Sequence, residues 1–185
     1  MTYVMSDIHG CYDKYMAMLD KIKFADSDTL YVLGDVVDRG DSPVKVLQNM
    51  TSRKNIIPIM GNHDYMAAFV LEKLLAEMTA DNGETHINKN FTAIMKIWLS
   101  DGGYSTFDEI KRLPGEELLN ILKYLKKFAP YEKITVNGKK FILTHAGLAT
   151  AAAYDNLEKY AMLGFVTAKT DYSKTYFSDA FLVTY

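Results

Sequence analysis

The amino-terminal part of the chain repeats one pattern three times: a short apolar run, a polar loop, and residues with helical periodicity. The apolar runs are strand-like in length and composition and cover Thr2–Met5, Thr29–Leu33 and Asn55–Met60. The helices that follow are predicted over Tyr12–Phe24, from Pro43 with Ser42 as the N-cap, and from about Asp64. Successive units of this kind predict a parallel sheet whose loops open at the same carboxyl edge.

The rest of the chain alternates helical and strand-like patterns. The predicted elements are helices within Asn88–Phe128, strands over Tyr131–Val136 and Lys139–Thr144, a helix near Tyr154–Leu163 and a strand over Ala180–Thr184. The helical part is broken at "SDGGY" and at Pro114-Gly115, and we expect it to be an insertion beside the sheet edge with little functional content. Asn137-Gly138 suits the type I′ turn of a hairpin. Together these elements predict an α/β fold.

Composition narrows the class of protein. The chain has 185 residues, of which 49% are hydrophobic, and this suits a single domain over residues 1–185. A net charge of -2 argues against a nucleic-acid partner. The single cysteine, Cys11, excludes an intramolecular disulfide, and the sequence shows neither a signal-peptide pattern nor a membrane-spanning apolar run. We therefore expect a cytoplasmic protein without a membrane partner; its oligomeric state stays open.

Potential metal ligands follow four of the predicted strands. Asp7 and His9 come after the first strand, Asp35 after the second, Asn62 after the third, and His145 after the hairpin. Residues i and i+2 of an extended segment point to the same side, so Asp7 and His9 can bind one ion together. The mixture of carboxylate and imidazole suits Mn²⁺, Fe²⁺ or Zn²⁺ better than Ca²⁺. Five ligands exceed the needs of one open site, and Asp35 is placed to bridge two ions.

The order of "SDIHG", "GDVVDRG", "GNHD" and "THAG" resembles the signature of the calcineurin-like metallophosphoesterases, in the phosphoprotein phosphatase form. The resemblance implies a β-sheet sandwich flanked by helices and two divalent metal ions, manganese first, with iron or zinc as alternatives. It assigns Asp7, His9 and Asp35 to one ion, and Asp35, Asn62 and His145 to the other. A hydroxide shared by the two ions would be the nucleophile.

The same resemblance implies roles for the residues around these ligands. His63 would be the general acid that protonates the leaving oxygen, and Asp38 would orient its ring. Arg39 would bind the phosphoryl oxygens, and Asn62 and Lys169 would also lie at the substrate. Lys169 stands where the family ordinarily has an arginine. Lysine keeps the positive charge but cannot make the bidentate hydrogen bonds of a guanidinium.

The "DRG" ending of the second motif favours a serine/threonine protein phosphatase of the bacterial or phage type, acting on a phosphoprotein or a small phosphate ester. Two alternatives stay open: a symmetrical dinucleoside tetraphosphate hydrolase, and an inactive fragment that binds metal or phosphoprotein. The family's second metal ordinarily takes a further histidine, from a Gly-His-Thr segment after a late strand. The sequence ends at Tyr185 before such a segment, so we expect a domain that is incomplete at its carboxyl end and lacks the last strands.

Overall fold

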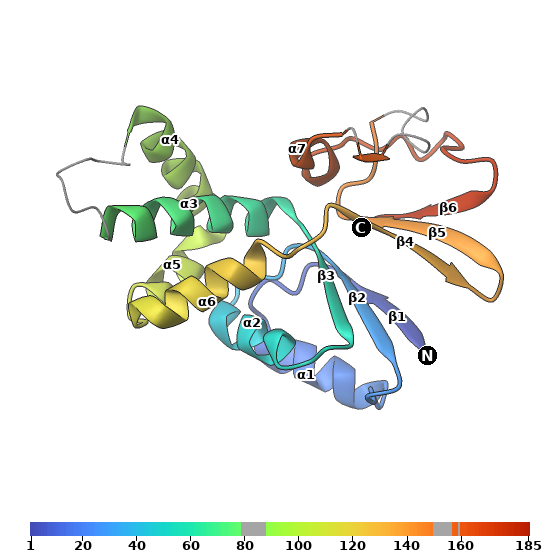
Figure 1. Cartoon of the computed structure of the whole chain (residues 1–185), viewed down its shortest axis with the longest axis horizontal. Coiled ribbons are helices and arrows are strands. Elements are labelled where there is room, and N and C mark those ends of the chain that lie inside the picture. Colours follow the sequence, from blue (N-terminus) through green and yellow to red (C-terminus); the bar gives the residue numbers. More distant parts are fainter. Residues whose placement is uncertain (79–87, 150–156, 159) are drawn as a thin grey trace.

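The protein contains two three-stranded sheets in the computed structural model, which describes residues 1–78, 88–149, 157–158 and 160–185 (Figure 1). The first sheet contains β1 (Thr2–Met5), β2 (Thr29–Leu33) and β3 (Ile56–Ile59), all parallel and in that order. The second contains β4 (Tyr131–Val136), β5 (Lys139–Thr144) and β6 (Ala180–Val183), with β4 antiparallel and β6 parallel to β5. The predicted strands are therefore present.

The two sheets pack face to face. Leu33 of β2, Ile59 of β3 and Leu143 of β5 form one buried apolar cluster between them, with Tyr31 and Phe141 packed against it. Side chains alternate along a strand, so β2 turns Tyr31 and Leu33 toward the second sheet and the intervening residues toward the helices. This packing confirms the predicted sheet sandwich.

Helices cover the other face of the first sheet and one end of the molecule (Figure 1). The helices are α1 (Tyr12–Lys21), α2 (Pro43–Thr51), α3 (Asn62–Met78), α4 (Lys89–Trp98), α5 (Tyr104–Ile110), α6 (Gly115–Leu125) and α7 (Met162–Val166), with a π-helical turn η1 (Leu99–Gly103) between α4 and α5. Leu30 and Val32 of β2 are buried in a core shared with Val44 and Leu47 of α2. The amphipathic pattern thus places α1 and α2 under the sheet, while α3 to α6 lie together beside its carboxyl edge.

Several boundaries differ from the sequence prediction. Helix α1 ends at Lys21 rather than Phe24, because the chain turns at Lys23, whose φ is 51°. Helix α3 begins at Asn62 rather than Asp64, so "GNHD" forms its first turn. Ser42 occupies the N-cap position of α2 but makes no side-chain cap hydrogen bond.

The capping hydrogen bond at the start of α2 comes from Glu109, whose carboxylate accepts the backbone N–H of Val44 at 2.8 Å. Ser42 and Pro43 therefore occupy the predicted positions at the start of α2, but the capping hydrogen bond comes from a side chain of α5 rather than from the serine. The predicted hairpin turn fits, with φ of 50° at Asn137 and 75° at Gly138, as a type I′ turn requires. Of the helix predicted near Tyr154–Leu163, residues 154–156 and 159 lie outside the described residues, and in the described part α7 begins only at Met162.

Among the residues that the structure describes, every helix is too short or too polar to cross a membrane.

Candidate active site

The loops that follow β1 and β2 run side by side beyond the ends of their strands. The backbone N–H of His9 donates to the carbonyl of Asp35 at 2.8 Å, and that of Asp7 donates to Gly34 at 3.2 Å. Gly34 has a φ of 77°, and a Cβ there would lie 2.5 Å from Cα of Gly61, so only glycine lets the third loop approach this closely. The three loops therefore bring their polar residues to one place, as the parallel topology predicts.

Backbone strain is concentrated in these loops. The predicted site residues with positive φ are Asp7 (53°), His9 (44°), Asp35 (52°), Asp38 (72°) and Arg39 (64°). Such conformations cost about 1–3 kcal/mol each when the residue is not glycine, and they persist only where the surrounding structure imposes them. Clusters of this kind are typical of functional sites, since the strain fixes where the side chains point.

Two of the predicted ligands, His9 and His145, are held in the same way. The Nδ1 atom of His9 lies 2.9 Å from the carbonyl oxygen of Val37, and Nδ1 of His145 lies 2.7 Å from that of Leu33. A carbonyl oxygen can only accept, so Nδ1 carries the proton in each ring and Nε2 presents its lone pair to the site. This is the arrangement in which proteins hold metal-binding histidines.

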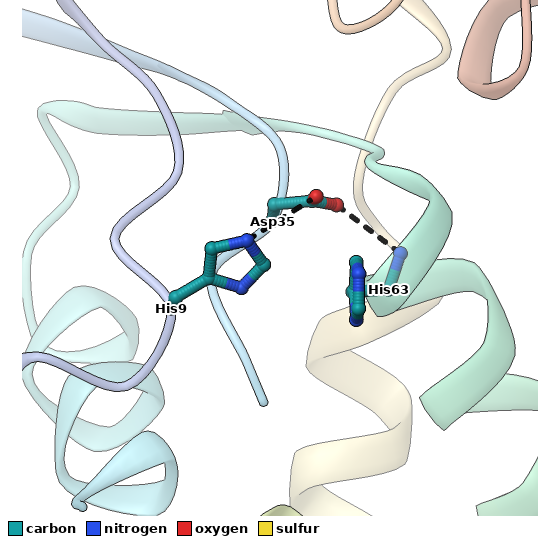
Figure 2. Close-up of side chains that lie close together, drawn as sticks. All are labelled: His9, Asp35 and His63. Atoms are coloured by element: carbon teal, nitrogen blue, oxygen red, sulfur yellow. Dashed lines mark hydrogen bonds and ion pairs between the residues drawn. The ribbon is translucent and has the colours of Figure 1, made fainter. Parts of the chain in front are cut away.

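Asp35 lies between the two histidines and is almost fully buried. Its Oδ2 is 3.6 Å from Nε2 of His9, and its Oδ1 is 3.5 Å from Nε2 of His145. The same Oδ1 accepts the backbone N–H of His63 at 3.1 Å, which holds the carboxylate in place (Figure 2). One oxygen thus faces each histidine, as a carboxylate that bridges two ions requires.

The donor set fits divalent metal ions. Oδ2 of Asp7 is buried and has no hydrogen-bond partner among the described residues, which suits a ligand atom. Oδ1 of Asn62 lies 3.0 Å from Nε2 of His145. In this orientation both atoms are hydrogen-bond acceptors. The contact is favourable if a cation binds both atoms, or if the Asn62 amide is rotated so that its NH2 group faces His145.

A ligand atom from each of His9, Asp35 and His63 also lies within 4.8 Å of the other two. These three side chains thus lie close enough to hold one ion, although the sequence predicts His63 as the general acid rather than as a ligand.

His63 and Asp38 form a buried pair. Nδ1 of His63 donates to Oδ2 of Asp38 at 2.7 Å. Burial lowers the pKa of His63, but the hydrogen bond to Asp38 and the negative charges of Asp35 and Asp38 outweigh it, so the net shift of the pKa is upward. The pair keeps the imidazole oriented with Nε2 toward the site, as an acid or base in catalysis must be.

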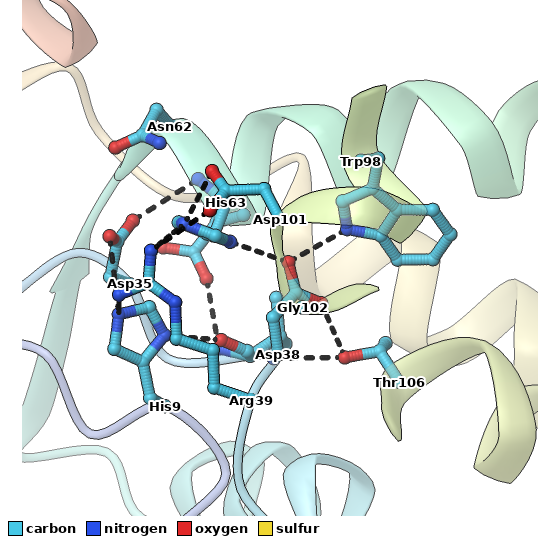
Figure 3. A network of polar contacts seen from close by, with 12 residues as sticks. His9, Asp35, Asp38, Arg39, Asn62, His63, Trp98, Asp101, Gly102 and Thr106 are labelled. Atoms are coloured by element: carbon cyan, nitrogen blue, oxygen red, sulfur yellow. Dashed lines mark hydrogen bonds and ion pairs between the residues drawn. The ribbon is translucent and has the colours of Figure 1, made fainter. Parts of the chain in front are cut away.

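Two further side chains bind the carboxylate of Asp38, and both come from the helical insertion (Figure 3). The indole N–H of Trp98 donates to Oδ2 at 2.7 Å, and the hydroxyl of Thr106 donates to Oδ1 at 2.6 Å. The sequence prediction of little functional content in this insertion was therefore wrong. Only the glycine pair in "SDGGY" hinted at a close approach, and it was interpreted as a helix break.

The guanidinium of Arg39 lies between two of the imidazoles. Its Nη1 is 2.9 Å from Nε2 of His9, its Nη2 is 3.0 Å from Nε2 of His63, and Nη2 also pairs with Asp101 at 3.3 Å. Since arginine only donates, both Nε2 atoms accept here. Arg39 must therefore leave His9 before that nitrogen can bind a metal, and must leave His63 before its Nε2 can carry a proton. The side chain is half-exposed, so it is accessible to a ligand from solvent.

Asp64 joins the loops rather than pointing into the site. Its Oδ1 accepts the N–H groups of Val36 and Val37 at 2.9 and 3.3 Å, and its Oδ2 accepts that of Gly61 at 3.1 Å. Complete burial, with the charge of Asp35 adding to it, raises the pKa of Asp64 to about 7, although the backbone N–H groups oppose the rise. The sequence predicts a helix from about Asp64, and this residue lies in the first turn of α3.

The carboxyl-terminal segment also reaches the site. The ring of Tyr185 stacks on that of His145, with 4.6 Å between the ring centres. Lys169 is exposed, and among the described residues it makes no hydrogen bond or ion pair with the predicted site residues. Its neighbour Thr170 donates to the carbonyl of Ala146 at 2.9 Å, which places this segment beside the loop that carries His145. A role for Lys169 at the substrate stays a prediction.

Known proteins resemble this chain in sequence and in fold. A symmetrical bis(5'-nucleosyl)-tetraphosphatase of Baumannia cicadellinicola is 32% identical over 149 residues, which are 80% of this chain and 42% of that protein. The protein of the same name from Salmonella typhimurium is 43% identical over 65 residues, which are 34% of this chain and 23% of that protein. The chain thus spans less than half the length of these curated relatives.

A solved structure, described as a candidate diadenosine tetraphosphatase, has a TM-score of 0.57 at 20% identity and covers 88% of this chain and 56% of its own. At that identity the likeness shows a common fold. The family model of the calcineurin-like phosphoesterases matches residues 2–179, which include all four motifs. The chain therefore belongs to the calcineurin-like phosphoesterase family.

Proposed function

We propose that this protein hydrolyses a small phosphate compound in a metal-dependent reaction, and that its substrate is a dinucleoside tetraphosphate. The observation that carries the reaction class is the placement of Asp35, with one carboxylate oxygen 3.6 Å from His9 and the other 3.5 Å from His145. The choice of substrate rests on the relatives, because a symmetrical bis(5'-nucleosyl)-tetraphosphatase shares 32% identity over 80% of this chain.

The residues of the site would have three different roles in phosphoryl transfer. Asp7, His9, Asp35, Asn62 and His145 would hold two divalent ions, which when bound polarise the phosphoryl oxygens and make water more acidic. Arg39 presents a planar fork of donors to the non-bridging oxygens. His63, oriented by Asp38, would give its Nε2 proton to the leaving oxygen.

The protein phosphatase suggested by the "DRG" motif is the second candidate. Its support is the arrangement of Asp38 and Arg39 themselves, which would serve a phosphoserine or phosphothreonine ester as well as an anhydride. The identity of the metal, with Mn²⁺ first, is likewise a proposal based on the mixed carboxylate and imidazole ligands.

The test is an assay of the full chain after removal of metal and titration with Mn²⁺, Fe²⁺ or Zn²⁺. We expect bound metal together with cleavage of diadenosine tetraphosphate into two diphosphates, faster than release of phosphate from a phosphoserine peptide. Asp35→Asn should abolish both metal binding and turnover. Asp108→Asn is the matched control, because it removes the same charge from an exposed position on α5.

The outcomes separate the candidates. Faster hydrolysis of the phosphopeptide would favour the protein phosphatase over the dinucleotide hydrolase. Stoichiometric metal binding without turnover of any substrate would reduce the function to binding. Turnover that survives Asp35→Asn would contradict the proposed site altogether.

A further inference from the structure

Asp101 lies against both groups that the proposed reaction needs at the phosphate. Its Oδ1 accepts from Nη2 of Arg39 at 3.3 Å, and its Oδ2 is 3.5 Å from Nε2 of His63. The close-up in Figure 3 shows this carboxylate beside Arg39 and His63, and its side chain is half-exposed. Asp101 belongs to η1, a part of the helical insertion with no motif of its own.

A carboxylate offers Arg39 the same kind of ligand as a phosphate does. Both are anions whose oxygens accept charge-assisted hydrogen bonds from a guanidinium. Because Nη2 of Arg39 and Nε2 of His63 already face the oxygens of Asp101, an incoming phosphate has to take the place of this carboxylate. The two anions cannot share these positions, since like charges at contact distance repel.

We propose that Asp101 is an internal anion in the phosphate subsite, and that it sets the affinity of the site by competing with the substrate. This inference rests on the proposed function, since that function gives Arg39 and His63 their roles at the phosphate. It makes Asp101 a determinant of affinity rather than a catalytic residue.

The backbone around Asp101 is anchored independently of its side chain. The N–H of Arg39 donates to the carbonyl of Gly102 at 3.0 Å. Gly102 has a φ of 105°, and a Cβ there would lie 2.6 Å from Cγ of Arg39, so glycine permits this contact. On the other side, Gly103 packs on the ring of Trp98. The half-exposed Asp101 side chain can therefore rotate away from Arg39 without movement of the η1 backbone.

The expected size of the competition is modest. Both partners of the pair are half-exposed, so solvent screens their attraction. Exposed ion pairs of this kind shift an equilibrium by about 1.5- to 5-fold. Asp101 would thus weaken phosphate binding by a similar factor without preventing it.

Trp98 provides the measurement. It is the one tryptophan of the sequence, and its indole N–H donates to Asp38, which in turn binds His63. The indole resonance of the metal-free full chain can be followed by NMR as inorganic phosphate is added. We expect Asp101→Asn, which preserves shape and removes charge, to bind phosphate about 1.5- to 5-fold more tightly than the parent.

Asp108→Asn is the matched control and should leave the affinity for phosphate unchanged, since Asp108 pairs with Lys111 and Arg112. Equal affinities in the parent and Asp101→Asn would overturn the inference. A gain shared by Asp108→Asn, or the lack of saturable binding by Asp101→Asn, would overturn it as well. The proposed function is tested by a different measurement: it is contradicted if the metal-loaded parent does not hydrolyse diadenosine tetraphosphate, whatever the phosphate affinity of Asp101→Asn.

Discussion

Trp98 donates its indole N–H to Asp38 over 2.7 Å, and the oxygen that accepts it is the one bound to Nδ1 of His63. The helical insertion and the "GDVVDRG" loop thus share one buried carboxylate. Thr106 binds the other oxygen, and its hydroxyl also accepts the backbone N–H of Asp38 at 2.9 Å. Asp38 is fully buried, so its charge depends on these donors for stabilisation.

Replacing Thr106 by valine should therefore destabilise the protein without changing the volume of the side chain. The substitution removes one donor to a buried carboxylate, and hydrogen bonds to charged groups contribute about 1.5–3 kcal/mol. We expect a loss of that size in the free energy of unfolding, measured by urea denaturation. Thr92→Val, at an exposed position of α4, is the control. A difference below about 0.5 kcal/mol between Thr106→Val and the parent would show that the contact is not stabilising.

The convergence of the four motifs could be predicted from sequence, because it follows from local patterns and one topological rule. Parallel strands joined by helices bring their carboxyl ends together, so Asp7, Asp35 and Asn62 had to meet once the strands were identified. The turn at Asn137-Gly138 was predictable for a similar reason, since the positive φ is a property of those two residues.

Contacts between distant segments could not be predicted in this way. Trp98 and Thr106 lie 60 and 68 residues after Asp38, and their types are as common in an apolar core as in a polar network. Local periodicity can predict that a tryptophan is buried, but it does not show whether its indole N–H also donates a hydrogen bond. Asp64 shows the same limit. The sequence predicts a helix that begins near it, whereas its hydrogen bonds to Val36 and Val37 depend on the tertiary approach of two loops.

Asp38→Asn should lower the pKa of His63. The hydrogen bond from Nδ1 and the charge of Asp38 both favour the protonated ring, and an amide supplies no charge. The measurement is an NMR titration of the imidazole protons of the metal-free protein. Asp179→Asn, which breaks an exposed pair with Lys140, is the control and should leave the pKa of His63 where it is in the parent. An unchanged pKa in Asp38→Asn would mean that Asp38 does not hold the proton on this ring.

Divalent metal should stabilise the parent protein but not Asp35→Asn. An ion that binds only the folded state at 100 times its dissociation constant adds about 2.7 kcal/mol to the free energy of unfolding. Asparagine at position 35 removes the charge that faces both His9 and His145. Thermal unfolding with Mn²⁺ and with a chelator measures the difference, with Asp108→Asn expected to respond like the parent. An equal rise in melting temperature for Asp35→Asn would place the metal elsewhere.

In the metal-free protein, Asp64 should make the folded state less stable as the pH rises from about 4 to 6. Burial and the charge of Asp35 raise its pKa to about 7. The unfolded chain loses this proton near a pKa of about 3.9. The folded state therefore binds more protons in this window, and the free energy of unfolding falls by at most about 1.4 kcal/mol per pH unit. Asp35→Asn should make the stability less dependent on pH, because removing the neighbouring charge lowers the pKa of Asp64, whereas the control Asp108→Asn should keep the pH dependence of the parent. Urea denaturation at a series of pH values measures both slopes. Equal slopes in the two variants would contradict the coupling between Asp35 and Asp64.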